Sequence, residues 1–173
     1  MPSTFTYRLA RRTVLAGALT ACVLSGCSIT PPVVPAGTPA WTGRMGLQIH
    51  DASAAEQSFS AAFHLEGSAA QGRLDIYNPL GSQIARLHWQ PGVAVLEQGD
   101  SRITSDALED LLLRSLGSAI PVAAMFDWLQ GVPSVSRGWQ VDLSRHAQGR
   151  ITAQRTQPTP EATLRIVLQQ PSL

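Results

Sequence analysis

Apolar and polar residues alternate along most of the chain after residue 40. In the first such stretch, apolar residues take every second position, and polar residues such as Arg44 and Gln48 stand between them. Strict alternation over five or more residues is typical of a half-buried antiparallel strand. The first half of this region is therefore predicted to be an antiparallel meander. Its alternating stretches are 41–50, 58–66, 73–76, 83–90, 93–98 and the residues around Ile103.

Two helices are predicted to interrupt this strand pattern. Leucines recur at helical spacing over 106–116, where Asp106 is a good N-cap residue and Gly117 a good C-terminal stop. Pro121 suits the first position of a second helix, which Gly131 would end. Strand alternation then resumes in three further stretches, at 139–143, 151–153 and 164–168.

A strand series with two helices inserted in it predicts a mainly β fold, in which a strongly curved antiparallel sheet covers two or three helices. Alternation alone does not decide which strand face points inward, or whether packed core or a cavity lies between sheet and helices. We expect ten apolar side chains to be mostly buried there, several of them lining one apolar pocket. These are Met45, Leu47, Phe59, Phe63, Leu74, Ile76, Leu112, Met125, Phe126 and Trp128.

The start of the chain has the pattern of a secretory signal peptide. Three arginines precede an apolar run over 13–24, which is too short to span a bilayer, since a spanning helix needs about 20 residues. Leu24-Ser25-Gly26-Cys27 follows and resembles a bacterial lipobox. In a lipobox the cysteine thiol takes a diacylglycerol, the peptide is cleaved before the cysteine, and the new amine is usually acylated. The alternative is an ordinary signal peptide with an accidental cysteine.

The lipobox divides the chain into three parts. We predict a cleaved signal peptide over 1–26, a lipidated Cys27 on a proline-rich tether over 27–40, and a single domain over 41–173. Proline-rich segments are semi-extended, at about 3.1 Å per residue. The tether would therefore hold the domain close to the membrane that carries the lipid.

Charge and cysteine content limit the possible partners. The chain has no lysine and thirteen arginines, three of them in the signal peptide, so the mature chain has ten against twelve acidic residues, a formal net charge of −2. The sequence shows neither the basic footprint of a nucleic-acid-binding protein nor a polybasic membrane segment. We therefore predict no nucleic-acid partner, and membrane attachment through the lipid. Cys22 would leave with the signal peptide and Cys27 would be acylated, which leaves no thiol for a disulfide.

No catalytic motif is visible in the sequence. It contains no nucleophile elbow, P-loop, dinucleotide fingerprint or zinc-protease motif. The four histidines are far apart and lack metal-ligand spacing. We therefore predict that the protein is not an enzyme, that it binds no metal, and that it carries no cofactor other than the covalent diacylglycerol and N-acyl chain of Cys27.

One predicted turn carries an unusual residue. Asn78-Pro79-Leu80-Gly81 fits a type I turn, with Asn, Pro and Gly at favoured positions. Leu80 then occupies the tip, where polar residues are usual. Taken alone, the pattern favours a Leu80 side chain that folds back onto the core. The alternative is an apolar finger in solvent, which would indicate contact with lipid or with a partner.

Four short motifs together resemble the LolB family of outer-membrane lipoprotein-sorting receptors. They are Trp41-x-Gly43-Arg44, Asn78-Pro79-Leu80-Gly81-Ser82, Leu116-Gly117 with Ile120-Pro121-Val122, and Trp128-Leu129-x-Gly131-x-Pro133. The resemblance implies an unclosed antiparallel β-barrel that holds helices over an apolar cavity. It also implies that Leu80, between Pro79 and Gly81, is the protruding residue of a membrane-insertion loop.

The same resemblance implies a function. Such a receptor is anchored in the outer membrane and faces the periplasm. It accepts acylated lipoproteins from a LolA-like carrier through their acyl chains and inserts them into the inner leaflet of the outer membrane; we expect it to be a monomer. Two other hypotheses remain open at this point. One is a structural or partner-binding envelope lipoprotein without acyl-chain transfer, and the other is a hydrolase with an unrecognised site.

Overall fold

The computed structural model describes residues 37–50, 57–116, 118, 120–136 and 138–169. The predicted signal peptide, the lipobox with Cys27, most of the tether, residues 51–56 and Gly117 lie outside these residues. Residues 31–173 belong to one compact unit.

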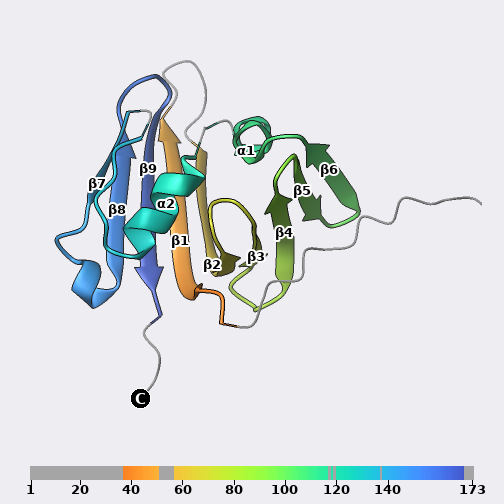
Figure 1. The fold of residues 1–173 in the computed structure, drawn as a ribbon, viewed down its shortest axis with the longest axis horizontal. Helices are drawn as coiled ribbons and strands as arrows, with labels where there is room; N and C mark the ends of the chain where they lie inside the picture. Colours follow the sequence, from red (N-terminus) through yellow and green to blue (C-terminus); the bar gives the residue numbers. More distant parts are fainter. Residues whose placement is uncertain (1–36, 51–56, 117, 119, 137, 170–173) are drawn as a thin grey trace, which may run out of the picture. The chain divides into compact units, whose positions relative to one another are not determined.

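Within the described residues, nine strands form one antiparallel sheet (Figure 1). The order of its strands is β6-β5-β4-β3-β2-β1-β9-β8-β7, so β6 and β7 are the two edges and the sheet is not closed. The prediction of a mainly β fold built on an unclosed antiparallel barrel is confirmed. The strands are β1 (Ala40–His50), β2 (Gln57–Gly67), β3 (Gly72–Tyr77), β4 (Gln83–Gln90), β5 (Val93–Gln98), β6 (Ser101–Ser105), β7 (Trp139–Asp142), β8 (Arg150–Arg155) and β9 (Glu161–Leu168).

Two α-helices lie between β6 and β7 in the chain, as predicted. The first, α1 (Leu108–Leu116), packs on β5 and β6, and the second is α2 (Val122–Leu129). Each begins one residue later than expected, because the carbonyl of Ala107 rather than Asp106 accepts the first helical hydrogen bond of α1, and Pro121 immediately precedes α2. A short 3-10 helix, η1 (His146–Gln148), precedes β8. Among the described residues, no helix has the length and apolar character needed to cross a membrane.

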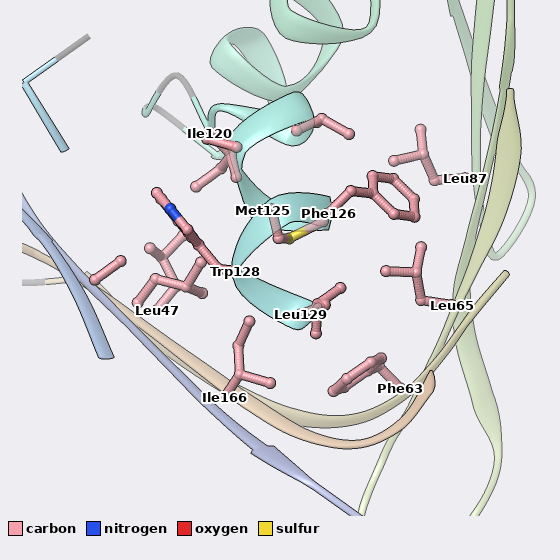
Figure 2. Packing of buried hydrophobic residues seen from close by; sticks show 14 of the residues in the cluster. Leu47, Phe63, Leu65, Leu87, Ile120, Met125, Phe126, Trp128, Leu129 and Ile166 are labelled. Carbon is pink, nitrogen blue, oxygen red and sulfur yellow. The ribbon is translucent and has the colours of Figure 1, made fainter. Parts of the chain in front are cut away.

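The core lies between α2 and the inner face of the sheet. Figure 2 shows the strands curving past α2, with Phe63, Leu65 and Leu87 pointing toward the helix. Aromatic contacts join the two layers, since the Phe126 ring lies 5.6 Å from Trp41 and 6.2 Å from Trp89 between centroids. Apolar faces on both the helix and the strands thus meet in one cluster, as the alternation predicted.

Close packing explains why a glycine, Gly43, stands in the first of the four motifs. A Cβ atom on Gly43 would lie 2.1 Å from the carbonyl oxygen of Val167 on β9, far inside contact distance. Gly43 therefore lets β1 and β9 approach closely, and this pairing joins the two halves of the sheet.

Candidate functional site

The predicted interior residues fall into three groups. Most of the ten are buried in the cluster, with the Trp128 side chain fully covered. Another three are partly buried against that cluster, and one is exposed. The buried residues are Leu47, Phe63, Ile76, Met125, Phe126 and Trp128, and the partly buried ones are Met45, Leu74 and Leu112.

Phe59 is the exception, because its side chain is 38% exposed although it was expected to be mostly buried. It pairs with Leu47 on β1, which is buried. The neighbouring strand β3 ends at Tyr77, which pairs with Ala62, so Phe59 lies beyond the part of β2 that β3 covers. The alternation correctly placed Phe59 on the inner face of β2, but the exposure of Phe59 depends on where the neighbouring strand β3 ends.

Several aromatic and aliphatic residues complete the interior and were not among the ten. Trp89 pairs with Gly72, in the same row of the inner face. A Cβ atom on Gly72 would collide with the Trp89 indole ring. Trp139 is fully buried with its ring 6.4 Å from that of Trp128. Both tryptophans stand in alternating stretches of the sequence. That alternation was the available signal for their inward direction.

One cation also points to the inner side of the sheet. Arg155 follows the buried residues Ile151 and Ala153 on the same face of β8 and is itself only 4% exposed. Its guanidinium carbon lies 5.5 Å from the centre of the Trp139 ring, and its Nη2 donates to the carbonyl of Pro160 at 2.9 Å. Burial lowers the pKa of Arg155. This end of the interior therefore has a polar group beside the apolar cluster.

A second buried charge, Asp75, belongs to the outer face. Its carboxylate accepts a hydrogen bond from Arg86 Nε at 2.6 Å and lies 3.1 Å from Arg73 Nε. The hydrogen bond to Asp75 raises the pKa of Arg86. Because these side chains alternate with the inward residues Leu74 and Ile76, they form a cross-strand ion network that is separate from the apolar interior.

The turn between β3 and β4 is held by its own hydrogen bonds. Asn78 Oδ1 accepts from the backbone N–H of Leu80 at 2.9 Å and of Ser82 at 3.0 Å, and the Asn78 carbonyl accepts from Gly81 N–H. Gly81 has a φ of 84°, a conformation that favours glycine. Leu80 is 91% exposed at the tip, the most exposed of the large apolar side chains described. The prediction made from the turn pattern alone was wrong, because the Leu80 side chain does not fold back onto the core.

The described residues hold no group of three His, Cys, Asp or Glu side chains that could bind a metal ion. The histidines occupy unrelated places. His64 lies near Glu66 on the outer face, whereas His146 contacts the carbonyl of Leu129 at the end of α2.

These features define the protein as an open β-barrel domain with an apolar interior under a helix and an exposed apolar turn. The chain belongs to the LolB family, since the family profile described as "Outer membrane lipoprotein LolB" matches residues 40–169. A relative from Bordetella petrii named "Outer-membrane lipoprotein LolB" is 30% identical over 86% of this chain and 88% of its own length. Relatives of the same name from Bordetella pertussis and Bordetella parapertussis are each 31% identical over the same shares. The predicted family membership is therefore confirmed.

Proposed function

We propose that this protein is an outer-membrane lipoprotein that accepts acylated lipoproteins from a periplasmic carrier and inserts them into the outer membrane. Family membership supports this proposal, because the relatives carry the name of an outer-membrane lipoprotein. The observation that carries it is the apolar cluster between α2 and the inner sheet face. We further propose that the protein acts as a receptor rather than as an enzyme.

The interior has the chemistry that an acyl chain requires. An acyl chain offers no hydrogen bonds, so it is recognised by area and shape on apolar side chains. The facing surfaces of α2 and the sheet supply leucine, isoleucine, phenylalanine, tryptophan and methionine. Met45 and Met125 can adapt to different chains because methionine is unbranched and flexible. One site of this kind would accept many client lipoproteins.

Such a transfer must run downhill in free energy, because the sequence contains no nucleotide-binding motif. A fifteen-carbon acyl chain exposed to water would cost on the order of 12 kcal/mol, at about 0.8 kcal/mol per methylene. A LolA-like carrier must therefore shield it. The receptor must then bind the chain more tightly than the carrier does, or couple binding to exit into the bilayer.

The Leu80 turn is proposed as the membrane-insertion element, with Pro79 and Gly81 holding its shape. Burial of one leucine side chain is worth about 1.5–3 kcal/mol. That is enough to orient a tethered domain on a bilayer without trapping it. The hydrogen bonds of Asn78 hold the backbone of this turn, and Leu80 is exposed at its tip.

The lipid anchor is proposed at Cys27, which would carry a diacylglycerol and an N-acyl chain. At about 3.1 Å per residue, the thirteen residues 28–40 of the proline-rich tether would reach roughly 40 Å. The residue after the cysteine is Ser28, not the aspartate that retains some lipoproteins at the inner membrane. We therefore propose an outer-membrane anchor with the domain facing the periplasm.

The proposal is tested by displacement of a fluorescent fatty acid from the purified acylated protein. We expect the probe to bind and a client lipoprotein delivered by the carrier to displace it. If the probe does not bind, or if clients leave it bound, the protein is a structural or partner-binding lipoprotein instead.

A further inference from the structure

The outer face of the sheet gathers three arginines that are far apart in the sequence, and a fourth, Arg145, adjoins them on the connection before β8. Arg44 on β1 pairs with Val167 on β9, and Val167 pairs with Arg150 on β8, so the three lie in one row across the sheet. Arg165 stands one row further along β9 on the same face. The backbone of Arg145 adjoins that of Arg150 through a hydrogen bond at 3.0 Å. All four arginines are exposed, and we call this surface the arginine patch.

Few acidic side chains lie near the arginine patch to neutralise its charge. Among the described residues, the arginines that form ion pairs are Arg73, Arg86 and Arg102, on β3, β4 and β6. Asp142 lies at the border of the patch, in the row of Arg165, and interacts electrostatically with Arg145. Glu161 lies on the same face at the start of β9, four residues before Arg165, and pairs with His50 on β1.

Two observations suggest what the arginine patch binds. The mature chain as a whole has a formal charge of −2, so four neighbouring arginines are a local excess of positive charge. They surround Val167, an apolar side chain that is 47% exposed. A cationic surface with an apolar centre matches the headgroup region of a bilayer with anionic phospholipids.

The arginine patch also adjoins the insertion loop. Tyr77 pairs with Ala62, and Ala62 pairs with Arg44, so Tyr77 stands in the same row two strands away. Two strand spacings are about 10 Å. The turn that carries Leu80 begins at the next residue, Asn78, so one membrane surface can engage both features.

We propose that the arginine patch binds the headgroups of anionic phospholipids and orients the domain when the Leu80 turn meets the bilayer. This inference rests on the proposed function, because it takes the membrane to be the surface that receives the turn. Each arginine near an anionic surface contributes about 1 kcal/mol, or roughly a fivefold change in the ratio of docked to undocked domain.

The test uses the acylated protein in vesicles of phosphatidylcholine, with or without phosphatidylglycerol. A Val167→Cys variant is labelled with a fluorophore, and its protection from a neutral aqueous quencher reports docking. A label on Val135→Cys is the control, because Val135 is 85% exposed on the connection between α2 and β7, outside the patch. We expect phosphatidylglycerol to protect the label at 167 but not the label at 135. About 1 M salt should abolish this protection, since it shortens the Debye length to about 3 Å.

Two matched double variants test the arginines. Arg44→Gln with Arg165→Gln should lower the docked ratio about 25-fold at two fivefold steps. Arg102→Gln with Arg114→Gln removes the same charge outside the patch and should leave the ratio near the wild-type value.

Failure of this inference is separable from failure of the proposed function. If the label at 167 stays accessible in both vesicles while carrier-fed insertion proceeds, the inference is wrong and the function stands. If phosphatidylglycerol protects the label but no client is inserted, the inference stands and the function fails. If the carrier alone protects the label in vesicles without phosphatidylglycerol, the patch binds an acidic protein surface, and the inference is overturned.

Discussion

The side chain of Asn78 holds the backbone of Leu80, with 2.9 Å between Asn78 Oδ1 and the Leu80 nitrogen. The same oxygen also accepts from Ser82 N–H. These bonds satisfy the backbone of the turn locally, without support from the core. The backbone shape of the turn that presents Leu80 is therefore set within the turn itself.

Replacing Asn78 tests this role of the turn. Asn78→Ala removes the acceptor, and a net loss of about 0.5–1.5 kcal/mol per hydrogen bond would loosen the turn. We expect acyl-chain uptake to stay intact and insertion into vesicles to slow. Asn78→Asp keeps the acceptor oxygens and is the control. Insertion by Asn78→Ala at the wild-type rate would show that a rigid turn is not needed.

Two phenylalanines on one face of β2 test the description of the interior. Phe63 is 3% exposed, whereas Phe59 is 38% exposed. Phe63→Ala should cost about 3–5 kcal/mol of unfolding free energy if Phe63 packs in a tight core, and less if it borders a cavity that takes an acyl chain. Phe59→Ala should cost clearly less, because water already reaches its ring. Urea unfolding of the two variants measures both values, and equal costs would contradict the placement of these residues.

Two glycines of β1, Gly43 and Gly46, allow a similar comparison, in which one substitution should destabilise the domain and the other should not. A Cβ atom at position 43 would collide with the backbone of Val167, whereas at position 46 its nearest neighbour, Phe59 O, is 3.7 Å away. We expect Gly43→Ala to lower the unfolding free energy by about 1–3 kcal/mol, as overpacking does. Gly46→Ala should be tolerated. Thermal unfolding compares the two, and a stable Gly43→Ala variant would rule out the close approach of β1 and β9.

Stability should depend on pH through His88. Its side chain is only 13% exposed, and burial lowers its pKa from the ordinary value of 6.5, although nearby Glu97 opposes this shift. The unfolded chain therefore binds the proton more readily than the folded domain. The stabilising contribution of neutral His88 is complete above pH 6.5 and is lost as the pH falls below that value toward the lower folded pKa.

Urea unfolding between pH 5 and pH 7.5 measures this dependence, with His88→Gln as the reference. We expect the advantage of the wild type over the variant to shrink at the acidic end. An advantage that stays constant or grows on acidification would show that His88 is not held neutral by burial.

The local features of the fold could be predicted from sequence. The strand limits at Gln83–Gln90 and Val93–Gln98 follow from alternation bounded by turn residues, and the chemistry of the β3–β4 turn follows from Asn78, Pro79 and Gly81. Both depend on residues close together in the chain. The exposure of Leu80 was not predicted by turn chemistry alone, because a turn of this type does not dictate where its tip side chain points.

Features that depend on distant pairing were not visible in the sequence. The exposure of Phe59 depends on where β3 ends, and the arginine patch depends on the pairing of β1 with β9, which brings Arg44 beside residues more than 120 positions away. The sequence after the signal peptide has no run of basic residues that would predict the patch, because the cluster forms only across strands. For the same reason, Arg155 was not predicted to lie beside Trp139.

The most direct test of the proposed function is a reconstitution of client transfer with Leu80→Glu. Val135→Glu is the matched control, because Val135 is also strongly exposed. Transfer from the carrier and insertion into vesicles are measured separately for the wild type and both variants. We expect Leu80→Glu to fold and take clients from the carrier normally but to fail to insert them, while Val135→Glu performs both steps. Insertion by Leu80→Glu at the wild-type rate would contradict the assignment of this turn as the delivery element.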